Sequence, residues 1–209
     1  MKAFRTVLFL SLIAGAGIAR ADYPQAPSGW KEASRSNEQV VFYREDEQVK
    51  AREFQVVGDI DAPPSAVFGV VTDVENHPKF MPFTQLSHIV QRVSPDEIVC
   101  YQVIAQPMVS QRDFYLHIKR TPGTSPDSVW RSEWYAVPEF GPENPGKVRI
   151  KVSQGSWQFE PIDGGRRTRL TYTSVTNIGG SIPRWMADMS SSSVLAKMYD
   201  SIRKRVAAR

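Results

Sequence analysis

The last thirty residues constrain this chain most, because they predict its longest helix. Gly179 and Gly180 allow a sharp turn. Ser181 can cap a helix start, and Pro183 suits a first helical turn. Helical spacing then continues for about 25 residues, carried by Ile182, Trp185, Met186, Met189, Leu195, Met198, Tyr199, Ile202 and Val206. The one gap, at the serines of residues 190–193, is either a solvated run or a place where the helix covers a cavity.

The other end of the chain has the pattern of a secretory signal peptide. Lys2 and Arg5 precede an apolar run over residues 7–18, and residues 19–21 (ARA) form a small-x-small cleavage site. We therefore expect cleavage near Ala21 and an exported protein, periplasmic or secreted and soluble. Removal of residues 1–21 leaves 188 residues (209 − 21), enough for one domain. We expect an N-terminal arm over residues 22–36 and a single domain over residues 37–209.

The charge of the chain gives little support to nucleic acid as a partner. The formal net charge is +4, from 26 basic and 22 acidic residues, but Lys2, Arg5 and Arg20 lie in the predicted signal peptide. Without those three the 26 basic residues become 23, so the net charge is about +1. The single cysteine, Cys100, has no partner for an intrachain disulfide. Stability must therefore come from packing.

Most of the remaining chain predicts antiparallel strands. Alternating or apolar runs separated by turns containing Pro or Gly predict strands at residues 39–44, 51–60, 87–93, 97–105, 112–120, 129–137, 147–159 and 167–176. A short helix is expected over residues 65–74. Alternation along several strands indicates a sheet with one buried and one wet face. The order predicts an α+β fold in which a curved antiparallel sheet wraps around the last helix.

Four segments resemble the START (StAR-related lipid-transfer) domain family, in the family's order. They are residues 60–74 (IDAPPSAVFGVVTDV), 106–114 (QPMVSQRDF), 161–172 (PIDGGRRTRLTY) and 177–185 (NIGGSIPRW). Any one of these motifs is weak, but four in sequence are specific. The resemblance implies a helix-grip fold, an incomplete antiparallel barrel around a long C-terminal helix with an apolar cavity between them.

The resemblance also implies a function, namely binding or carriage of one hydrophobic molecule such as a sterol or a phospholipid. Some sterol-binding members place a basic residue in the cavity a few positions beyond the RDF motif. At such a position, six residues past Arg112, this chain has Ile118 instead of a basic residue. The exported member expected here would carry its ligand without covalent chemistry and without a cofactor.

Eight residues are our candidates for contact with such a ligand: Tyr101, Arg112, Trp134, Trp157, Tyr172, Trp185, Met189 and Ser193. The aromatic candidates fit a cavity wall and a packed core equally well. Arg112 either enters the cavity to orient a polar head group or ties its strand to the adjoining loop. On a strand, Arg112 and Asp113 point to opposite faces, so they should not pair with each other. Loops near Met81, Phe83 and Met108 are candidate gates.

Basic clusters suggest a second partner, the surface of an anionic membrane. Arg166, Arg167 and Arg169 crowd one turn and strand, and further basic residues end the chain. Such runs are either solvated faces or a docking surface on which a carrier loads and unloads.

Two other classes of function stay open at this stage. The wider helix-grip superfamily includes cyclases, dehydratases and hydrolases, and Tyr101, Tyr172 or His117 could serve acid–base chemistry. Alternatively, the domain binds another envelope protein and the cavity is incidental. A metal site is not expected, because His77, His88 and His117 lie on different predicted elements without ligand spacing.

Overall fold

The computed structural model describes residues 23–179 and 184–209, and side chains from residue 192 onward in the last helix. Its centre is one sheet of ten strands in the order β1-β2-β3-β10-β9-β7-β6-β5-β4, with β8 beside β6. All neighbouring strands are antiparallel except β6 and β8. The strands are β1 (Lys31–Arg35), β2 (Gln39–Asp46), β3 (Ala51–Ile60), β4 (Thr84–Arg92), β5 (Glu97–Ile104), β6 (Arg112–Thr121), β7 (Trp130–Ala136), β8 (Val148–Arg149), β9 (Val152–Ile162) and β10 (Arg167–Asn177).

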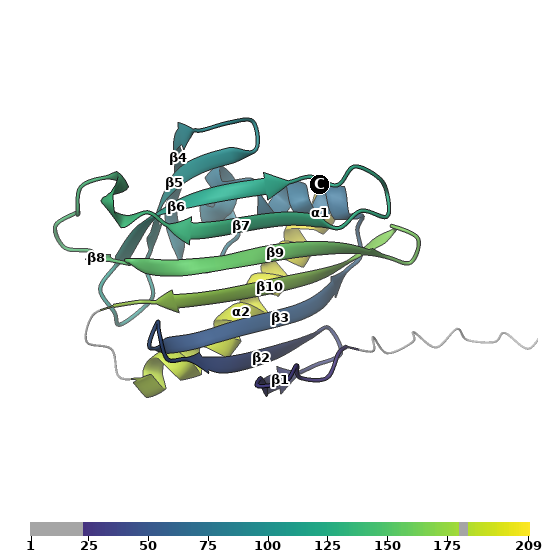
Figure 1. Ribbon diagram of the computed structural model, residues 1–209, viewed down its shortest axis with the longest axis horizontal. Helices are drawn as coiled ribbons and strands as arrows, with labels where there is room; N and C mark the ends of the chain where they lie inside the picture. Colours follow the sequence, from purple (N-terminus) through teal and green to yellow (C-terminus); the bar gives the residue numbers. More distant parts are fainter. Residues whose placement is uncertain (1–22, 180–183) are drawn as a thin grey trace, which may run out of the picture.

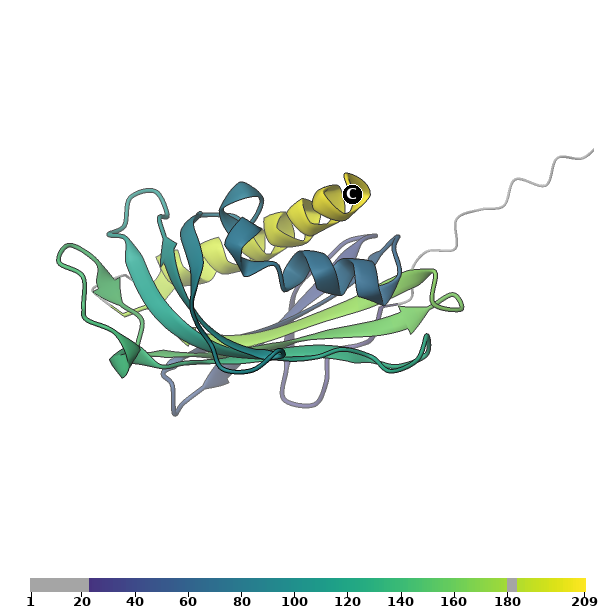
Figure 2. The same cartoon turned by 90° about the horizontal axis from the view of Figure 1, so that it is seen from above.

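The helical segments are α1 (Pro64–Val71), the 3₁₀ helices η1 (Val74–Lys79) and η2 (Pro138–Phe140), and α2 (Arg184–Ala207). Figure 1 shows the sheet strand by strand, and Figure 2 shows that it curves around α2, with α1 and η1 on the same concave side. The predicted α+β architecture, a curved antiparallel sheet holding a long C-terminal helix, is confirmed.

The chain order explains how the sheet is built. The hairpin β2–β3 pairs with the last strand, β10, through eight residue pairs between β3 and β10. The chain then crosses through α1 and η1 to the far edge at β4 and returns strand by strand to β10. The last helix, α2, follows β10 in the chain and crosses the concave face (Figure 2).

The local sequence accounts for α1 and its end. Pro64 occupies the first turn, where its missing N–H is not needed. Val67, Phe68 and Val71 are buried against the sheet. Thr72 ends the helix, since both its backbone N–H (2.9 Å) and its hydroxyl (2.8 Å) donate to the carbonyl of Phe68. The predicted helix over residues 65–74 therefore stops earlier than expected, and η1 follows it.

Two other strand predictions differ from the structure. The single strand expected over residues 147–159 is divided, because the N–H groups of Val148 and Ile150 donate to the carbonyls of Gln111 and Asp113 (both 2.9 Å). These bonds hold β8 alongside β6, so β9 begins only at Val152. Within the expected N-terminal arm, residues 31–35 form β1 at the sheet edge.

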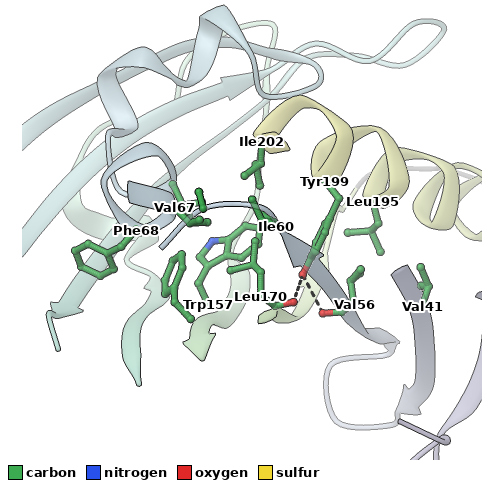
Figure 3. Packing of buried hydrophobic residues seen from close by; sticks show 13 residues of the cluster. Val41, Val56, Ile60, Val67, Phe68, Trp157, Leu170, Leu195, Tyr199 and Ile202 are labelled. Atoms are coloured by element: carbon green, nitrogen blue, oxygen red, sulfur yellow. Dashed lines mark hydrogen bonds between the residues drawn. The ribbon is translucent and has the colours of Figure 1, made fainter. Parts of the chain in front are cut away.

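The main core lies between α2, α1 and the sheet (Figure 3). Leu195, Tyr199 and Ile202 follow one another at helical spacing, and all three are buried. The hydroxyl of Tyr199 lies 2.9 Å from the carbonyl oxygens of both Val56 and Leu170. This contact joins α2 to β3 and β10. Among the described residues, no helix combines the length and the apolar character needed to cross a membrane.

Candidate functional site

A pocket of about 270 Å³ lies beside this core, between the concave face of the sheet and α2. Five strands each contribute two or more alternate residues to it, because side chains on a strand point in turn to its two faces. These lining residues are Gln102 and Ile104 on β5, Phe114, Leu116 and Ile118 on β6, Ser132 and Trp134 on β7, Ser153 and Trp157 on β9, and Tyr172, Ser174 and Thr176 on β10. The pocket wall is mostly apolar.

The helices close the pocket from the other side. Val194, Leu195 and Met198 of α2 line it, together with Val71 of α1 and His77 of η1. Met81, Pro82 and Thr84 complete the wall where the chain enters β4. The pocket therefore draws on every layer of the fold.

An aromatic cluster forms one wall. The rings of Trp134 and Tyr172 stack with centroids 5.7 Å apart, and Trp157 is 4.5 Å from Tyr172. Gly155 on β9 makes room for this arrangement, since a Cβ atom there would collide with the Trp134 indole and the Thr173 carbonyl. Burial raises the pKa of the Tyr172 hydroxyl, and a hydrogen bond with Ser174 lowers it in part. The structure thus brings three of the predicted aromatic residues together at the pocket.

A polar group lies at the η1 side of the same pocket. The Nε2 atom of His77 is 2.9 Å from the carbonyl oxygen of Val71, and its Nδ1 atom is 3.3 Å from the amide nitrogen of Gln102. That amide nitrogen also donates to the hydroxyl of Ser87 at 3.0 Å. Burial lowers the pKa of His77, although Val71 and Asp73 oppose this effect. Uncharged polar groups therefore face an otherwise apolar space here.

Further hydroxyl groups on the sheet satisfy one another. Ser153 and Thr176 are 2.9 Å apart, and the hydroxyl of Ser174 donates to the carbonyl of Gln154 at 3.2 Å. These groups add polarity to the wall without adding charge.

Tyr101 does not line the pocket, although we predicted ligand contact for it. On β5 the inward positions are Gln102 and Ile104, so Tyr101 faces the opposite side of the sheet. There its hydroxyl donates to Asp113 at 3.0 Å. Burial and the neighbouring Asp113 carboxylate raise the pKa of Tyr101 to about 12.

Asp113 is the centre of a buried ion-pair network on that outer side. Arg149 donates to it from Nε (2.9 Å) and Nη2 (3.0 Å), and Asn144 donates at 2.9 Å. Burial alone would raise the pKa of Asp113, but hydrogen bonds from Arg149, Asn144 and Tyr101 lower it overall. Arg149 also donates to three backbone carbonyls of residues 138–142. The network is structural and pins β6 to β8 and the loop before it.

Arg112 is buried, but it is not a lining residue of the pocket. Its Nη1 atom donates to the carbonyl of Ser110, and its Nε atom has no hydrogen-bond partner among the described residues. Burial lowers the pKa of the guanidinium. The bond to Ser110 is the strand-to-loop tie that we weighed against a head-group role. As the alternation predicts, Arg112 and Asp113 point to opposite faces and do not pair.

Of the three gate candidates, one lines the pocket and two do not. Met81 lines the pocket, whereas Phe83 and Met108 do not. Phe83 (φ 60°) and Met108 (φ 67°) both adopt left-handed backbone, which is uncommon for such side chains. Met108 is 91% exposed, and the carbonyl of Phe83 accepts a hydrogen bond from the backbone of Ala105 (2.9 Å). The two loops therefore lie side by side.

The helix candidates give a mixed result. The side chains of Trp185 and Met189 lie outside the described residues. Ser193 is exposed and does not line the pocket, since it lies two residues before Leu195 and thus on nearly the opposite face of α2. Of the serine gap, only Ser192 and Ser193 have described side chains.

Several basic residues that we considered for membrane docking have acidic partners. Arg167 pairs with Asp61 and Asp163, and Arg169 pairs with Asp59 at 2.9 Å. Near the C-terminus, Arg203 pairs with Asp200, and Arg209 with Asp73. Much of this positive charge is thus neutralised locally.

Sequence reasoning did not single out His77 or Gln102 as pocket residues. For Gln102 the signal was incomplete: it shares a strand face with Ile98 and Cys100 on β5, but alternation does not say that this face is the inner one. For His77 there was none, since η1 reaches the pocket only through the tertiary fold. Across residues 23–179 and 192–209, no three His, Cys, Asp or Glu side chains gather closely enough to hold a metal ion.

With this fold and pocket, the chain belongs to the family described as polyketide cyclase / dehydrase and lipid transport, which residues 60–203 match. The family contains enzymes as well as lipid carriers. An uncharacterised protein of Pseudomonas aeruginosa is 28% identical over 184 residues, which cover 88% of this chain and 86% of that protein.

Solved structures with this fold come from both groups. A STAR-related lipid transfer protein from Xanthomonas axonopodis matches with a TM-score of 0.76 and 26% identity, covering 85% of this chain and 98% of that one. Human StAR-related lipid transfer protein 5 matches with a TM-score of 0.78 and 20% identity, covering 87% and 88%. The Zhui aromatase/cyclase of Streptomyces matches more distantly, with a TM-score of 0.51 and 16% identity over 75% and 91%. The START helix-grip fold predicted from the four motifs is confirmed.

Proposed function

We propose that this protein binds one hydrophobic, lipid-like molecule in the pocket under α2 and carries it without covalent chemistry. The observation that carries this proposal is the pocket itself, about 270 Å³ of mostly apolar space between sheet and helix. Apolar walls with a few placed polar groups suit lipid-sized ligands. Sterols and phospholipids are the ligand classes that we consider first.

The apolar walls supply enough free energy for binding. Burying about 400 Å² of ligand surface at about 25 cal/mol per Å² contributes about 10 kcal/mol before the cost of association. Trp134, Trp157 and Tyr172 offer wide, rigid contact surfaces to such a ligand. The similarity to the Xanthomonas lipid transfer protein supports the same function.

The polar groups of the pocket favour binding over chemistry. Both ring nitrogens of His77 are already engaged, and burial lowers its pKa, so it is poorly placed to take up a proton. The raised pKa of Tyr172 keeps its hydroxyl protonated at neutral pH. Among the described residues, neither group is hydrogen-bonded to an acidic or basic side chain, the arrangement that acid–base catalysis uses.

Release of the ligand requires that the pocket open, and we propose that the loops around Met81, Phe83 and Met108 form the gate. Left-handed backbone at Phe83 and Met108 supports this assignment, because strained residues cluster at segments that move. The exposed Met108 is suited to enter the surface of a bilayer during transfer.

We further propose that the protein works outside the cytoplasm and touches anionic membranes transiently. Export rests on the signal-peptide pattern of residues 1–21. Binding to phosphatidylcholine vesicles, with and without phosphatidylglycerol and at low and high salt, tests the membrane contact. Binding that depends neither on anionic lipid nor on salt would remove the electrostatic part of the proposal.

The first experiment is native mass spectrometry of the protein isolated gently from the envelope of its own host, followed by lipid extraction. A one-to-one hydrophobic adduct is expected, and its mass names the ligand class. An empty protein that also binds no lipid added at micromolar concentration would contradict the proposal.

A second candidate function is an aromatase or cyclase activity on a polyketide-like substrate. The family description and the presence of the Tyr172 hydroxyl in the pocket favour it. Turnover of a ring-forming substrate that is lost in Tyr172→Phe would support this function. Absence of turnover across a broad substrate panel, with lipid binding intact, would leave the carrier function alone.

A further inference from the structure

We propose that Gln102 selects the ligand by accepting a hydrogen bond from it, so that the pocket prefers a neutral lipid bearing a hydroxyl or amide N–H group. This inference rests on the proposed function, because it concerns the same pocket. It goes further in naming the chemical group that the pocket recognises and the atom that recognises it, Oε1 of Gln102.

The first step is the state of the His77 ring. A carbonyl oxygen only accepts hydrogen bonds, so the Nε2 atom that lies 2.9 Å from the Val71 oxygen must carry a hydrogen. Burial keeps the ring neutral by lowering its pKa. In a neutral imidazole with a hydrogen on Nε2, Nδ1 has a lone pair and accepts.

The second step is the orientation of the Gln102 amide. Its end group lies 3.3 Å from Nδ1 of His77 and 3.0 Å from the hydroxyl of Ser87. Because Nδ1 accepts, this end must be the NH₂ group, since a flipped amide would place an oxygen against the His77 lone pair. His77 and Ser87 therefore hold the amide in one orientation, with Oε1 pointing elsewhere.

The third step is that Oε1 remains available. Gln102 is only 8% exposed, yet it lines the pocket. Within the described part of the chain Oε1 accepts no hydrogen bond, and it is not among the fully buried side-chain atoms that lack a partner, so it keeps some accessible surface. Of its neighbours on the same face, Phe114 across the strands and Ile104 along β5 are apolar. The pocket thus contains an oriented acceptor with apolar side chains beside it.

Such an acceptor discriminates between ligands. A ligand with a hydroxyl or N–H group satisfies Oε1, whereas an ether or hydrocarbon displaces water and leaves the oxygen unpaired. One hydrogen bond of this kind corresponds to about tenfold in affinity. An ionised carboxylate brings no donor and is repelled by the amide oxygen, so free fatty acids should bind weakly.

The test compares four probes of equal chain length: 1-dodecanol, dodecanamide, 1-methoxydodecane and dodecanoate. Displacement of Nile red from the full mature protein gives the affinity of each probe. In the wild type we expect the alcohol and the amide to bind about tenfold more tightly than the ether, and dodecanoate more weakly than the alcohol. The alcohol and amide arms distinguish the two donor groups.

Gln102→Leu should abolish the preference, because it weakens binding of the alcohol and leaves binding of the ether unchanged. Gln102→Met serves the same comparison if the leucine variant does not fold. The matched control is Gln154→Leu, the same change at an exposed position on β9 that does not line the pocket. It should keep the wild-type preference.

Three outcomes would overturn the inference: equal affinity of the wild type for alcohol and ether, a preference that survives in Gln102→Leu, or tightest binding of dodecanoate. The last outcome would direct attention to the buried guanidinium of Arg112 instead. Failure of the proposed function looks different, since then none of the four probes binds the wild type.

Discussion

The ring of Tyr199 lies directly against the backbone of Gly58, so that a Cβ atom on Gly58 would be 2.8 Å from the Cδ1 and Cε1 atoms of the ring. The hydroxyl at the far end of the same ring reaches the carbonyls of Val56 and Leu170 (Figure 3). The missing side chain at Gly58 therefore sets how closely α2 approaches the sheet.

Gly58→Ala should destabilise the protein, because the new methyl group forces the Tyr199 ring away from β3. Overpacking of this kind typically costs about 1–3 kcal/mol. Urea unfolding followed by tryptophan fluorescence measures the change in the free energy of unfolding. Gly69→Ala in α1 is the control, since its Cβ would meet nothing closer than Arg209 at 3.8 Å and alanine favours helix. Equal losses in both variants would contradict the packing argument.

Gly155→Ala should disturb the pocket wall, because its Cβ would collide with the indole of Trp134 and the carbonyl of Thr173. We expect a loss of about 1–3 kcal/mol in stability and a changed near-ultraviolet circular dichroism spectrum, since the stacking of Trp134 on Tyr172 is broken. Nile red binding should weaken in parallel. A variant with wild-type spectrum and binding would show that the wall adjusts without loss.

Asp113→Asn should cost about 3–5 kcal/mol at neutral pH, because it leaves the buried charge of Arg149 without its partner. The pKa of Asp113 is lowered in the folded protein, so its stabilisation is fully present above the unfolded pKa of about 3.9 and is lost as the pH falls through the folded value. The wild type should therefore lose stability in acid more steeply than the variant. Urea unfolding at neutral pH and near pH 3 checks both statements.

A matched control for the Asp113–Arg149 pair is Glu143→Gln, which breaks the exposed ion pair between Glu143 and Lys151 (3.4 Å). Exposed pairs contribute little, so a change below about 1 kcal/mol is expected. If Asp113→Asn were as mild as the control, the buried network would not stabilise the junction of β6 and β8.

Cys100 should be inert in the folded protein, because burial raises the pKa of its thiol to about 12. Only the thiolate reacts with Ellman's reagent, and at pH 8 about one thiol in ten thousand is ionised at that pKa. We expect a reaction at least on the order of a hundredfold slower in buffer than in urea. The control is Ser34→Cys at an exposed position, where the new thiol should react equally fast in buffer and in urea. Rapid labelling of Cys100 in buffer would instead show that the sheet opens locally.

Met108→Glu should slow transfer of a fluorescent lipid between anionic vesicles while leaving its affinity in solution unchanged. The reason is that Met108 is exposed beside the proposed gate, where a negative charge opposes contact with the bilayer. Val93→Glu is the control, since Val93 is also exposed but follows β4 at the other end of the β4–β5 hairpin. Equal transfer rates for both variants and the wild type would remove Met108 from the docking surface.

Local sequence patterns predicted most of the secondary structure, because hydrophobic periodicity and turn residues act over a few neighbours. The strand over residues 51–60 coincides with β3, and the long C-terminal helix with α2. The division of β8 from β9 was not predictable in this way. It depends on bonds from Val148 and Ile150 to Gln111 and Asp113, at the start of β6 and more than thirty residues earlier in the chain.

The candidate site was predicted less completely, for a related reason. Alternation along β5 separates Tyr101 from Gln102, but it does not say which of them faces the pocket, and we chose Tyr101. The aromatic residues Trp134, Trp157 and Tyr172, which fitted a cavity wall and a packed core equally well, do line the pocket. The partner of Asp113 could not be read from the chain, because Arg149 lies 36 residues away.

The sequence by itself determined the order of strands and helices, the two-sided character of each strand and, through four motifs, the family. Only the tertiary structure decided which side of each strand faces α2, that the ring of Tyr199 packs against Gly58, and which polar groups meet at the pocket. The physical reason is that periodicity is a property of neighbouring residues, whereas the inner face of a sheet is defined by elements that arrive from elsewhere in the chain. His77 and Gln102 illustrate this, since η1 and β5 bring them together across 25 residues of sequence.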